Sequence, residues 1–134
     1  MNNAIERELL ETGVLVLRLN RPEVLNAMNR DLIVGLLNTI NETIDDEKVR
    51  SIVLTGNGRG FCAGADLVDG GWPNEDNLSA GQSAGKNMET AFNPLVKAIT
   101  QSGKPIVTAI NGIAAGGGVG LALSGDIVIA AKSA

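Results

Sequence analysis

The sequence predicts an α/β domain, and three of its properties support that fold class. Apolar residues repeat with a period of two in some segments and of about 3.6 in others, and the two kinds of segment alternate along the chain. The 134 residues suffice for one domain, 1–134, and 44% of them are hydrophobic, so the chain can bury a core. Glycine accounts for 17 residues, well above the usual ~7%. We therefore expect a domain in which backbone groups supply much of the functional surface.

The first part of the chain should form a β-hairpin, a helix and a strand. Residues 6–10 and 14–19 flank a turn at 11–13, and the second strand is apolar on both faces, which favours a central place in a sheet. Asn29 is a suitable cap for a helix whose apolar residues form one stripe: Leu32, Ile33, Leu36, Leu37, Ile40 and Ile44. Residues 51–55 predict a short strand.

The middle of the chain predicts irregular structure. Residues 56–66 contain too many glycines for a helix or a strand, so we expect a loop. Residues 69–85 are polar, which is typical of a surface excursion or a lid. Within them, Trp72 would either anchor the lid over a ligand or cover the surface.

The last part should contain a split helix followed by alternating strands and helices. Apolar residues at helical spacing occupy 88–99, and Pro94 inside this helix should kink or split it. Further expected elements are a strand at 106–110, a helix at 114–124 and a strand at 127–130. Residues 105–125 carry no charge, but their polar residues and glycines favour a strand, turn and helix over a membrane span.

Residue counts exclude several function classes. Eleven basic residues against 15 acidic ones give a net charge of −4, which argues against a nucleic-acid partner. The chain has no histidine, so Ser-His and Cys-His nucleophile activation and most zinc sites are excluded, and we expect no metal. Cys62 is the single cysteine and cannot form an internal disulfide. We therefore expect a cytoplasmic protein without a secretion leader.

Two glycine-rich segments share one design. At residues 55–66 and again at 110–118, an apolar strand leads into glycines and then into a turn or helix. Bare N–H groups in such segments can point at a ligand oxygen, and two of them converging on one oxygen form an oxyanion hole. The glycines could equally serve tight turns and close packing, and their spacing does not decide between the two. Dinucleotide-binding fingerprints do not fit, because Phe61 and Leu121 stand where glycine is required.

Four motifs, in order, give the chain a family resemblance. They are LNRPEVLNAM at 19–28, GFCAGADL at 60–67, the pair KP at 104–105 with AING at 109–112, and AGGG at 115–118 with GDI at 125–127. With these motifs the chain resembles the N-terminal half of the enoyl-CoA hydratase/isomerase (crotonase) superfamily. The resemblance implies a spiral of repeated strand-strand-helix (ββα) units, with this chain ending before the C-terminal helical region.

The resemblance also implies a substrate and a site. Family members bind an acyl-CoA and polarise its thioester carbonyl with two backbone N–H groups, which by motif position belong to Ala65 and Gly117. The backbone around Leu25 and Ala27 is expected to contact the nucleotide end of coenzyme A. Other expected substrate contacts flank the two donors: Ala63, Gly64, Asp66, Leu67, Val68 and Gly116. Coenzyme A enters as part of the substrate, with no permanently bound cofactor, and the full-length protein is expected to be a homotrimer or hexamer.

One position departs from the hydratase pattern. Gly120 stands where family hydratases carry a first catalytic glutamate, and the second family acid would lie beyond residue 134. The resemblance therefore favours an isomerase over a hydratase, in fatty-acid or aromatic-acid degradation. The alternative is a non-catalytic or incomplete relative that binds CoA or assembles without turnover.

Three side chains have competing interpretations. Cys62 lies in an apolar motif without a base, which favours a packing residue over a nucleophile. Asp66 follows a glycine turn, where a carboxylate more often caps local N–H groups than acts as a general base. Asp126 precedes an apolar strand, and we expect a structural role.

Overall fold

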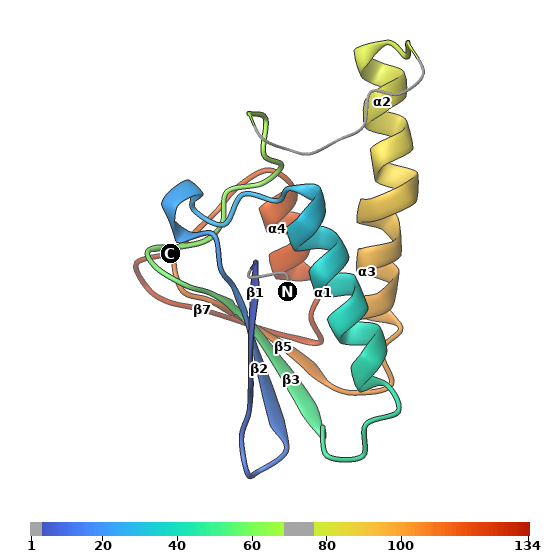
Figure 1. Cartoon of the computed structure of the whole chain (residues 1–134). Helices are drawn as coiled ribbons and strands as arrows, with labels where there is room; N and C mark the ends of the chain where they lie inside the picture. The colour runs from blue at the N-terminus through green and yellow to red at the C-terminus, as the bar shows by residue number, and fades with distance from the viewer. Residues whose placement is uncertain (1–3, 69–76) are drawn as a thin grey trace.

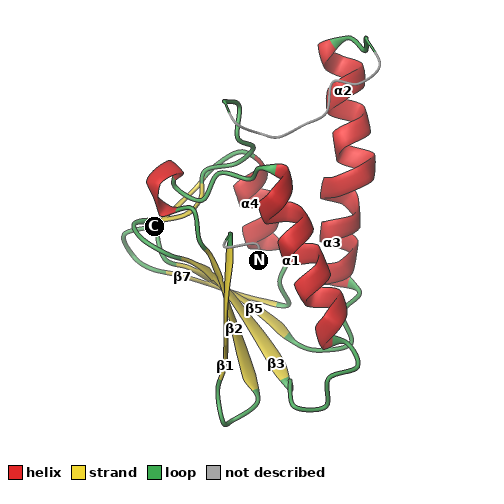
Figure 2. Cartoon of the chain, in the orientation of Figure 1, coloured by secondary structure: helices red, strands yellow, loops and turns green. Residues whose placement is uncertain are grey.

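A five-stranded sheet forms the base of the molecule. The computed structural model describes residues 4–68 and 77–134. The strand order is β1-β2-β3-β5-β7, in which β1 runs antiparallel to β2 and all other neighbours are parallel. Figures 1 and 2 show these strands fanning out below the helices. The strand bounds are β1 Ile5–Leu9, β2 Val14–Leu19, β3 Ser51–Gly56, β5 Ile106–Ile110 and β7 Ile127–Ala130. The hairpin and the strands predicted at 51–55, 106–110 and 127–130 are confirmed.

A second, two-stranded sheet follows the ends of β3 and β5. Strand β4 (Gly60–Cys62) pairs in parallel with β6 (Ile113–Ala114). The prediction of a continuous loop at 56–66 is therefore wrong for part of that segment. The helix expected from residue 114 begins only at Gly117, because residues 113 and 114 belong to β6. A prediction from local glycine content cannot detect these short strands, because a partner distant in the sequence supplies their hydrogen bonds.

Helices cover one face of the sheet. The helical elements are η1 Pro22–Val24, α1 Arg30–Thr43, α2 Ala80–Asn87, the π-helical segment Met88–Phe92 (η2), α3 Asn93–Thr100 and α4 Gly117–Leu123. The predicted Asn29 cap of α1 is confirmed, because its side chain accepts a hydrogen bond from the Leu32 N–H at 2.9 Å. Pro94 lies in the first turn of α3, directly after the π-helical segment. The regular α-helical pattern is therefore interrupted where expected, but the backbone stays helical and the helix is not split in two.

The predicted excursion at residues 69–85 is wrong for its last part. Residues from Ala80 onward form α2, with a capping box at Ser79 and Gln82. Helices α2 and α3 follow each other almost as one rod in Figure 2. Trp72 lies outside the described residues.

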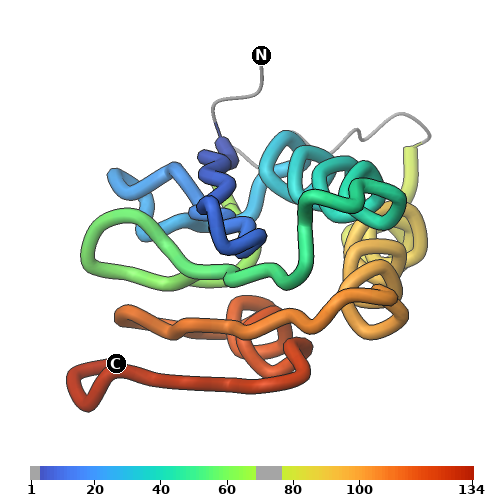
Figure 3. Tube along the Cα trace, turned by 90° about the horizontal axis from the view of Figure 1, so that it is seen from below, coloured from blue at the N-terminus to red at the C-terminus, as the bar shows by residue number. Residues whose placement is uncertain are grey.

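The core lies between the sheet and the two helices α1 and α3. Leu15, Leu17 and Leu19 of β2 are buried, whereas the alternate residues of that strand are half-buried, so only one of its apolar faces is packed tightly. The core is completed by side chains from β3, α1 and α3, including Leu54, Leu36, Ile40, Leu95 and Ile99. By contrast, all four residues of β7 are exposed, and Figure 3 shows this strand at the outer edge of the sheet.

Residues 4–68 and 77–134 contain neither a candidate membrane span nor a candidate metal cluster. No helix in these segments is both long and apolar enough to cross a bilayer. The same residues hold no group of three or more histidine, cysteine, aspartate or glutamate side chains that could bind a metal ion.

Candidate active site

The two glycine-rich segments meet in space. A Cβ on Gly64 would lie 2.9 Å from the Ala115 carbonyl oxygen and 3.5 Å from the Gly117 nitrogen, so the two turns are in direct contact. The Ala115 N–H donates to the Cys62 carbonyl at 3.0 Å. Pairing of β4 with β6 therefore brings together segments that are about 50 residues apart in the sequence.

Hydrogen bonds on both sides of Ala65 orient its N–H group. The Met28 N–H donates to the Gly64 carbonyl at 2.7 Å, and the Asp66 N–H donates to the Met28 carbonyl at 3.0 Å. This is the pattern of a parallel bridge between Met28 and Ala65. A trans peptide places its C=O and N–H on opposite sides. The Gly64 carbonyl faces Met28, so the Ala65 N–H points away from the Met28 backbone.

The Gly117 N–H is the first of helix α4. Gly116, which precedes it, has φ 52° and ψ −128°, a conformation that glycine adopts and other residues avoid. The N–H groups of Gly118 and Val119 donate to Ala115 and Gly116, but a first-turn N–H has no acceptor within its own helix. Across the part of the chain that the structure describes, neither Ala65 nor Gly117 donates its N–H to a protein acceptor.

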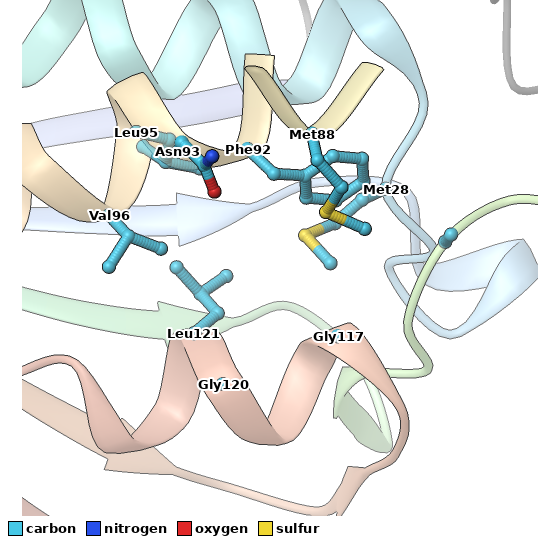
Figure 4. Close-up of a pocket in the computed structure, with 10 residues that line it drawn as sticks. Met28, Met88, Phe92, Asn93, Leu95, Val96, Gly117, Gly120 and Leu121 are labelled. Carbon is cyan, nitrogen blue, oxygen red and sulfur yellow. The ribbon is translucent and has the colours of Figure 1, made fainter. Parts of the chain in front are cut away.

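Both residues line one apolar pocket of about 240 Å³. Figure 4 shows it between α4 on one side and the η2–α3 segment on the other, with the side chains of Met28 and Met88 pointing into it. The lining is Met28, Ala65, Met88, Phe92, Asn93, Leu95, Val96, Gly117, Gly120 and Leu121. Asn93 is the one polar side chain among these described residues. An apolar lining lowers the local dielectric, so N–H groups inside it interact strongly with a negatively charged oxygen.

The remaining predicted substrate contacts lie outside the pocket lining. Leu25 and Asn26 have positive φ values of 53° and 56°, and the turn that they form packs on β4 through a bond from the Ala63 N–H to the Leu25 carbonyl. Leu67 and Val68 are 94% and 98% exposed. Gly64 and Gly116 hold the positive-φ turns before the two donors.

The Leu25–Ala27 turn depends on a buried amide that sequence reasoning did not single out. Asn26 is fully buried, and its Oδ1 accepts from the Arg21 N–H at 2.8 Å. Its Nδ2 donates to the carbonyls of Asn57 and Gly60 at 3.0 and 2.9 Å. The signal was present in the motif LNRPEVLNAM, because an Asn beside left-handed backbone is a frequent turn-former. The apolar lining residues Met88, Phe92 and Val96 were predicted only as part of a helical stripe, not as pocket positions.

The three side chains with competing interpretations have structural partners. The Asp66 carboxylate accepts from Arg21 Nη1 at 2.9 Å and from the Val68 N–H at 3.0 Å, which confirms local capping. Asp126 Oδ2 accepts from the Ile106 N–H at 2.8 Å, which confirms its structural role. Cys62 is buried, and this burial raises the pKa of its thiol, outweighing the opposite effect of a hydrogen bond from the Gly64 backbone. A protonated, buried thiol is a poor nucleophile.

Fold and pocket together define an α/β protein in which two glycine turns meet beside one apolar cavity, with Ala65 and Gly117 among its lining residues. Residues 10–134 match the enoyl-CoA hydratase/isomerase family. The chain belongs to this family, and its fold is the crotonase fold.

Relatives in sequence and in structure agree with this assignment. The chain is 46% identical over 125 residues to the 1,2-epoxyphenylacetyl-CoA isomerase of Escherichia coli, covering 93% of this chain and 47% of that protein. An enoyl-CoA hydratase/isomerase structure from Mycobacterium paratuberculosis has a TM-score of 0.81 and 32% identity, covering 98% of this chain and 51% of that one. A monofunctional enoyl-CoA isomerase structure from Mycobacterium smegmatis has a TM-score of 0.77 and 30% identity, with coverages of 98% and 51%. The chain thus spans about half the length of the relatives it matches.

Proposed function

We propose that the protein is an acyl-CoA thioester enzyme that stabilises a thioester enolate with the N–H groups of Ala65 and Gly117. The observation that carries this proposal is that both residues line one apolar pocket while neither donates to a protein acceptor within the described residues. Removal of a proton next to a thioester carbonyl builds negative charge on the oxygen. One well-placed donor to such an oxygen is worth about 10²–10³ in rate.

The proposal favours an isomerase over a hydratase. Gly120 lines the pocket, and a Cβ at this position would meet no atom within 4 Å, so a side chain there would have space to enter the cavity. This is the position where the family resemblance expects the first glutamate of a hydratase. With glycine at this position, a hydration that uses two glutamates would lack one of them. A double-bond isomerase can move its proton with a single carboxylate. The relative from Escherichia coli is itself named an isomerase.

The expected contacts of coenzyme A come from the family resemblance. We place its nucleotide end at the Leu25–Ala27 turn and its thioester at Ala65 and Gly117, with the acyl group among the apolar side chains of η2, α3 and α4. No permanent cofactor is required, because the carbonyl is polarised by backbone groups. The substrate then belongs to fatty-acid or aromatic-acid degradation. On the basis of the resemblance, we also propose that the full-length protein is a cytoplasmic homotrimer or hexamer. Light scattering on the full-length gene product would measure its mass.

A second candidate function is binding of an acyl-CoA without turnover. The observation that favours it is that no carboxylate is among the described residues lining the pocket. The 134-residue chain and the full-length gene product should be compared for deuterium exchange at the α-carbon of a saturated acyl-CoA in D₂O. Exchange by the full-length protein supports the enzyme, whereas acyl-CoA binding without exchange in both forms supports the binding protein.

The donor assignment is tested with Gly117→Val in the full-length protein. A Cβ on Gly117 would lie 3.0 Å from Met28 Cε, so added bulk enters the pocket beside the donor. We expect α-proton exchange to fall about 10²-fold or more. Gly85→Val is the matched control, because Gly85 lies in α2 and a Cβ there meets nothing within 4 Å. Exchange by Gly117→Val at the rate of the control would contradict the assignment.

A further inference from the structure

A buried ion pair joins the two chain segments that bracket Ala65. Arg21 Nη1 lies 2.9 Å from Asp66 Oδ2, and the two side chains are 13% and 7% exposed. The same nitrogen donates to the Ala27 carbonyl at 2.5 Å. Ala27 directly precedes Met28 and Asp66 directly follows Ala65, so the guanidinium connects the two segments beside the Met28–Ala65 bridge.

Stability alone gives a weak reason for such a pair. Removing two charges from water costs free energy that their attraction repays only in part, and apolar replacements of similar volume are often neutral or stabilising. The other ion pairs of the described residues, Arg7–Glu42 and Arg18–Glu8, lie at the surface, where this cost is small. A role in positioning the backbone around Ala65 therefore explains the Arg21–Asp66 pair better than stability does.

The segment after Ala65 has little else to hold it. Leu67 and Val68 are almost fully exposed and add no packing. Gly64, on the other side, has φ 101°, and as a glycine it has many alternative backbone conformations. The direction of the Ala65 N–H therefore depends on the two backbone bonds to Met28 and on the anchorage of Asp66, whose Oδ1 also accepts from the Val68 N–H.

We propose that Arg21 and Asp66 are positioning residues that fix the direction of the Ala65 N–H and tie it to the Leu25–Ala27 turn. This inference rests on the proposed function, because it assigns the pair to one donor of that site. It gives Asp66 a role through Ala65, without contact to the substrate. A misaligned N–H donor still allows the acyl-CoA to bind. It stabilises less well the negative charge that develops on the carbonyl oxygen in the transition state.

The test uses Asp66→Asn in the full-length protein and measures two quantities. The first is kcat and KM for α-proton exchange, and the second is the infrared frequency of a ¹³C-labelled thioester carbonyl in the bound acyl-CoA. We expect kcat to fall about tenfold to a hundredfold, as for a donor displaced by roughly 1 Å, while KM stays within about threefold. The shift of the carbonyl band to lower frequency on binding should shrink in parallel.

Two further variants make the result interpretable. Arg21→Lys keeps the charge and a donor on a shorter, more flexible side chain, so its kcat should fall less than that of Asp66→Asn. Glu8→Gln removes the charge of the exposed pair with Arg18 and should leave both quantities unchanged. If Asp66→Asn does not fold, Arg21→Lys decides by the same two measurements.

The outcomes separate this inference from the proposed function. A carbonyl band that does not shift on binding to the unaltered protein overturns the proposed function. A band that shifts in the unaltered protein, together with an unchanged shift and kcat in folded Asp66→Asn, overturns the positioning role. A rise in KM with kcat unchanged also overturns it, because that result assigns Asp66 to direct substrate contact.

Discussion

The two turns that carry the candidate donors are built in opposite ways. The turn at Gly64–Ala65 is held by the buried Arg21–Asp66 side-chain pair, beside its two backbone bonds to Met28. The turn at Gly116–Gly117 has no side-chain cap and depends on the absence of side chains. A Cβ on Gly118 would overlap the Cys62 carbonyl oxygen, so the second turn can approach β4 only because this residue is glycine.

This difference shows two ways to fix a backbone N–H. When both partners of a buried ion pair are removed, the chain can still form the turn, so we expect the direction of the N–H group to change more than the fold; removal of one partner alone leaves a buried charge. A close backbone approach permits no added atom, so its loss should change the fold itself. Three measurements on the two turns test this contrast.

The largest expected effect comes from leaving Arg21 without its partner. Asp66→Leu buries an unpaired guanidinium and should lower the free energy of unfolding by about 3–5 kcal/mol. The double variant Arg21→Met with Asp66→Leu removes both charges and should return to within about 1 kcal/mol of the unaltered protein. Urea unfolding of Arg21→Met, Asp66→Leu and the double variant gives the interaction free energy between the two side chains. Additive losses would show that Arg21 and Asp66 do not interact energetically, and would contradict the predicted cost of an unpaired guanidinium.

A smaller effect is expected at the second turn. Gly118→Ala should lower the free energy of unfolding by about 1–3 kcal/mol, because α4 must move away from the Cys62 carbonyl to admit a methyl group. Gly120→Ala, in the same helix, meets nothing within 4 Å and should raise the stability by about 0.5–1 kcal/mol through helix propensity. Equal urea midpoints for the two variants would contradict the close approach of α4 to β4.

The smallest effect concerns the thiol of Cys62, a residue that both turns contact. Burial raises the pKa of Cys62, so the folded state favours the protonated thiol. The resulting stability is fully present below the ordinary pKa of a thiol and is lost as the pH rises from there through the raised value. Unfolding free energies measured from pH 7 upward should therefore fall more steeply for the unaltered protein than for Cys62→Ala. Parallel pH profiles would show that the thiol ionises equally well in both states.

Much of the fold was predictable because its elements have strong local signals. The cap at Asn29, the interruption before Pro94 and the stripe of α1 from Leu32 to Ile40 are set by neighbouring residues, and the structure confirms them. The predicted end of the stripe is wrong, because Ile44 follows the helix and is 46% exposed. Strands β4 and β6 were missed, because three-residue and two-residue strands contain too little periodicity to separate them from a glycine-rich loop. Their existence depends on their pairing with each other.

The candidate site was also predictable only in part. The motif GFCAGADL and the glycine run at 115–118 pointed to Ala65 and Gly117, and the structure places both in one pocket. The apolar residues around them were predicted only as a helical stripe, since helical spacing does not tell a core position from a cavity position. The partner of Asp66 was not predicted, because Arg21 lies 45 residues earlier in the chain.

The two backbone N–H groups were offered by the family resemblance alone. Local sequence was enough to specify the alternation of strands and helices and the glycine turns. These features follow from propensities and spacings within a few residues, which act before the chain is compact. The meeting of the two turns, the apolar cavity and the buried Arg21–Asp66 pair arise only when β4 pairs with β6 and α3 faces α4. Such contacts depend on sheet register and on packing between distant segments, which no short stretch of sequence encodes.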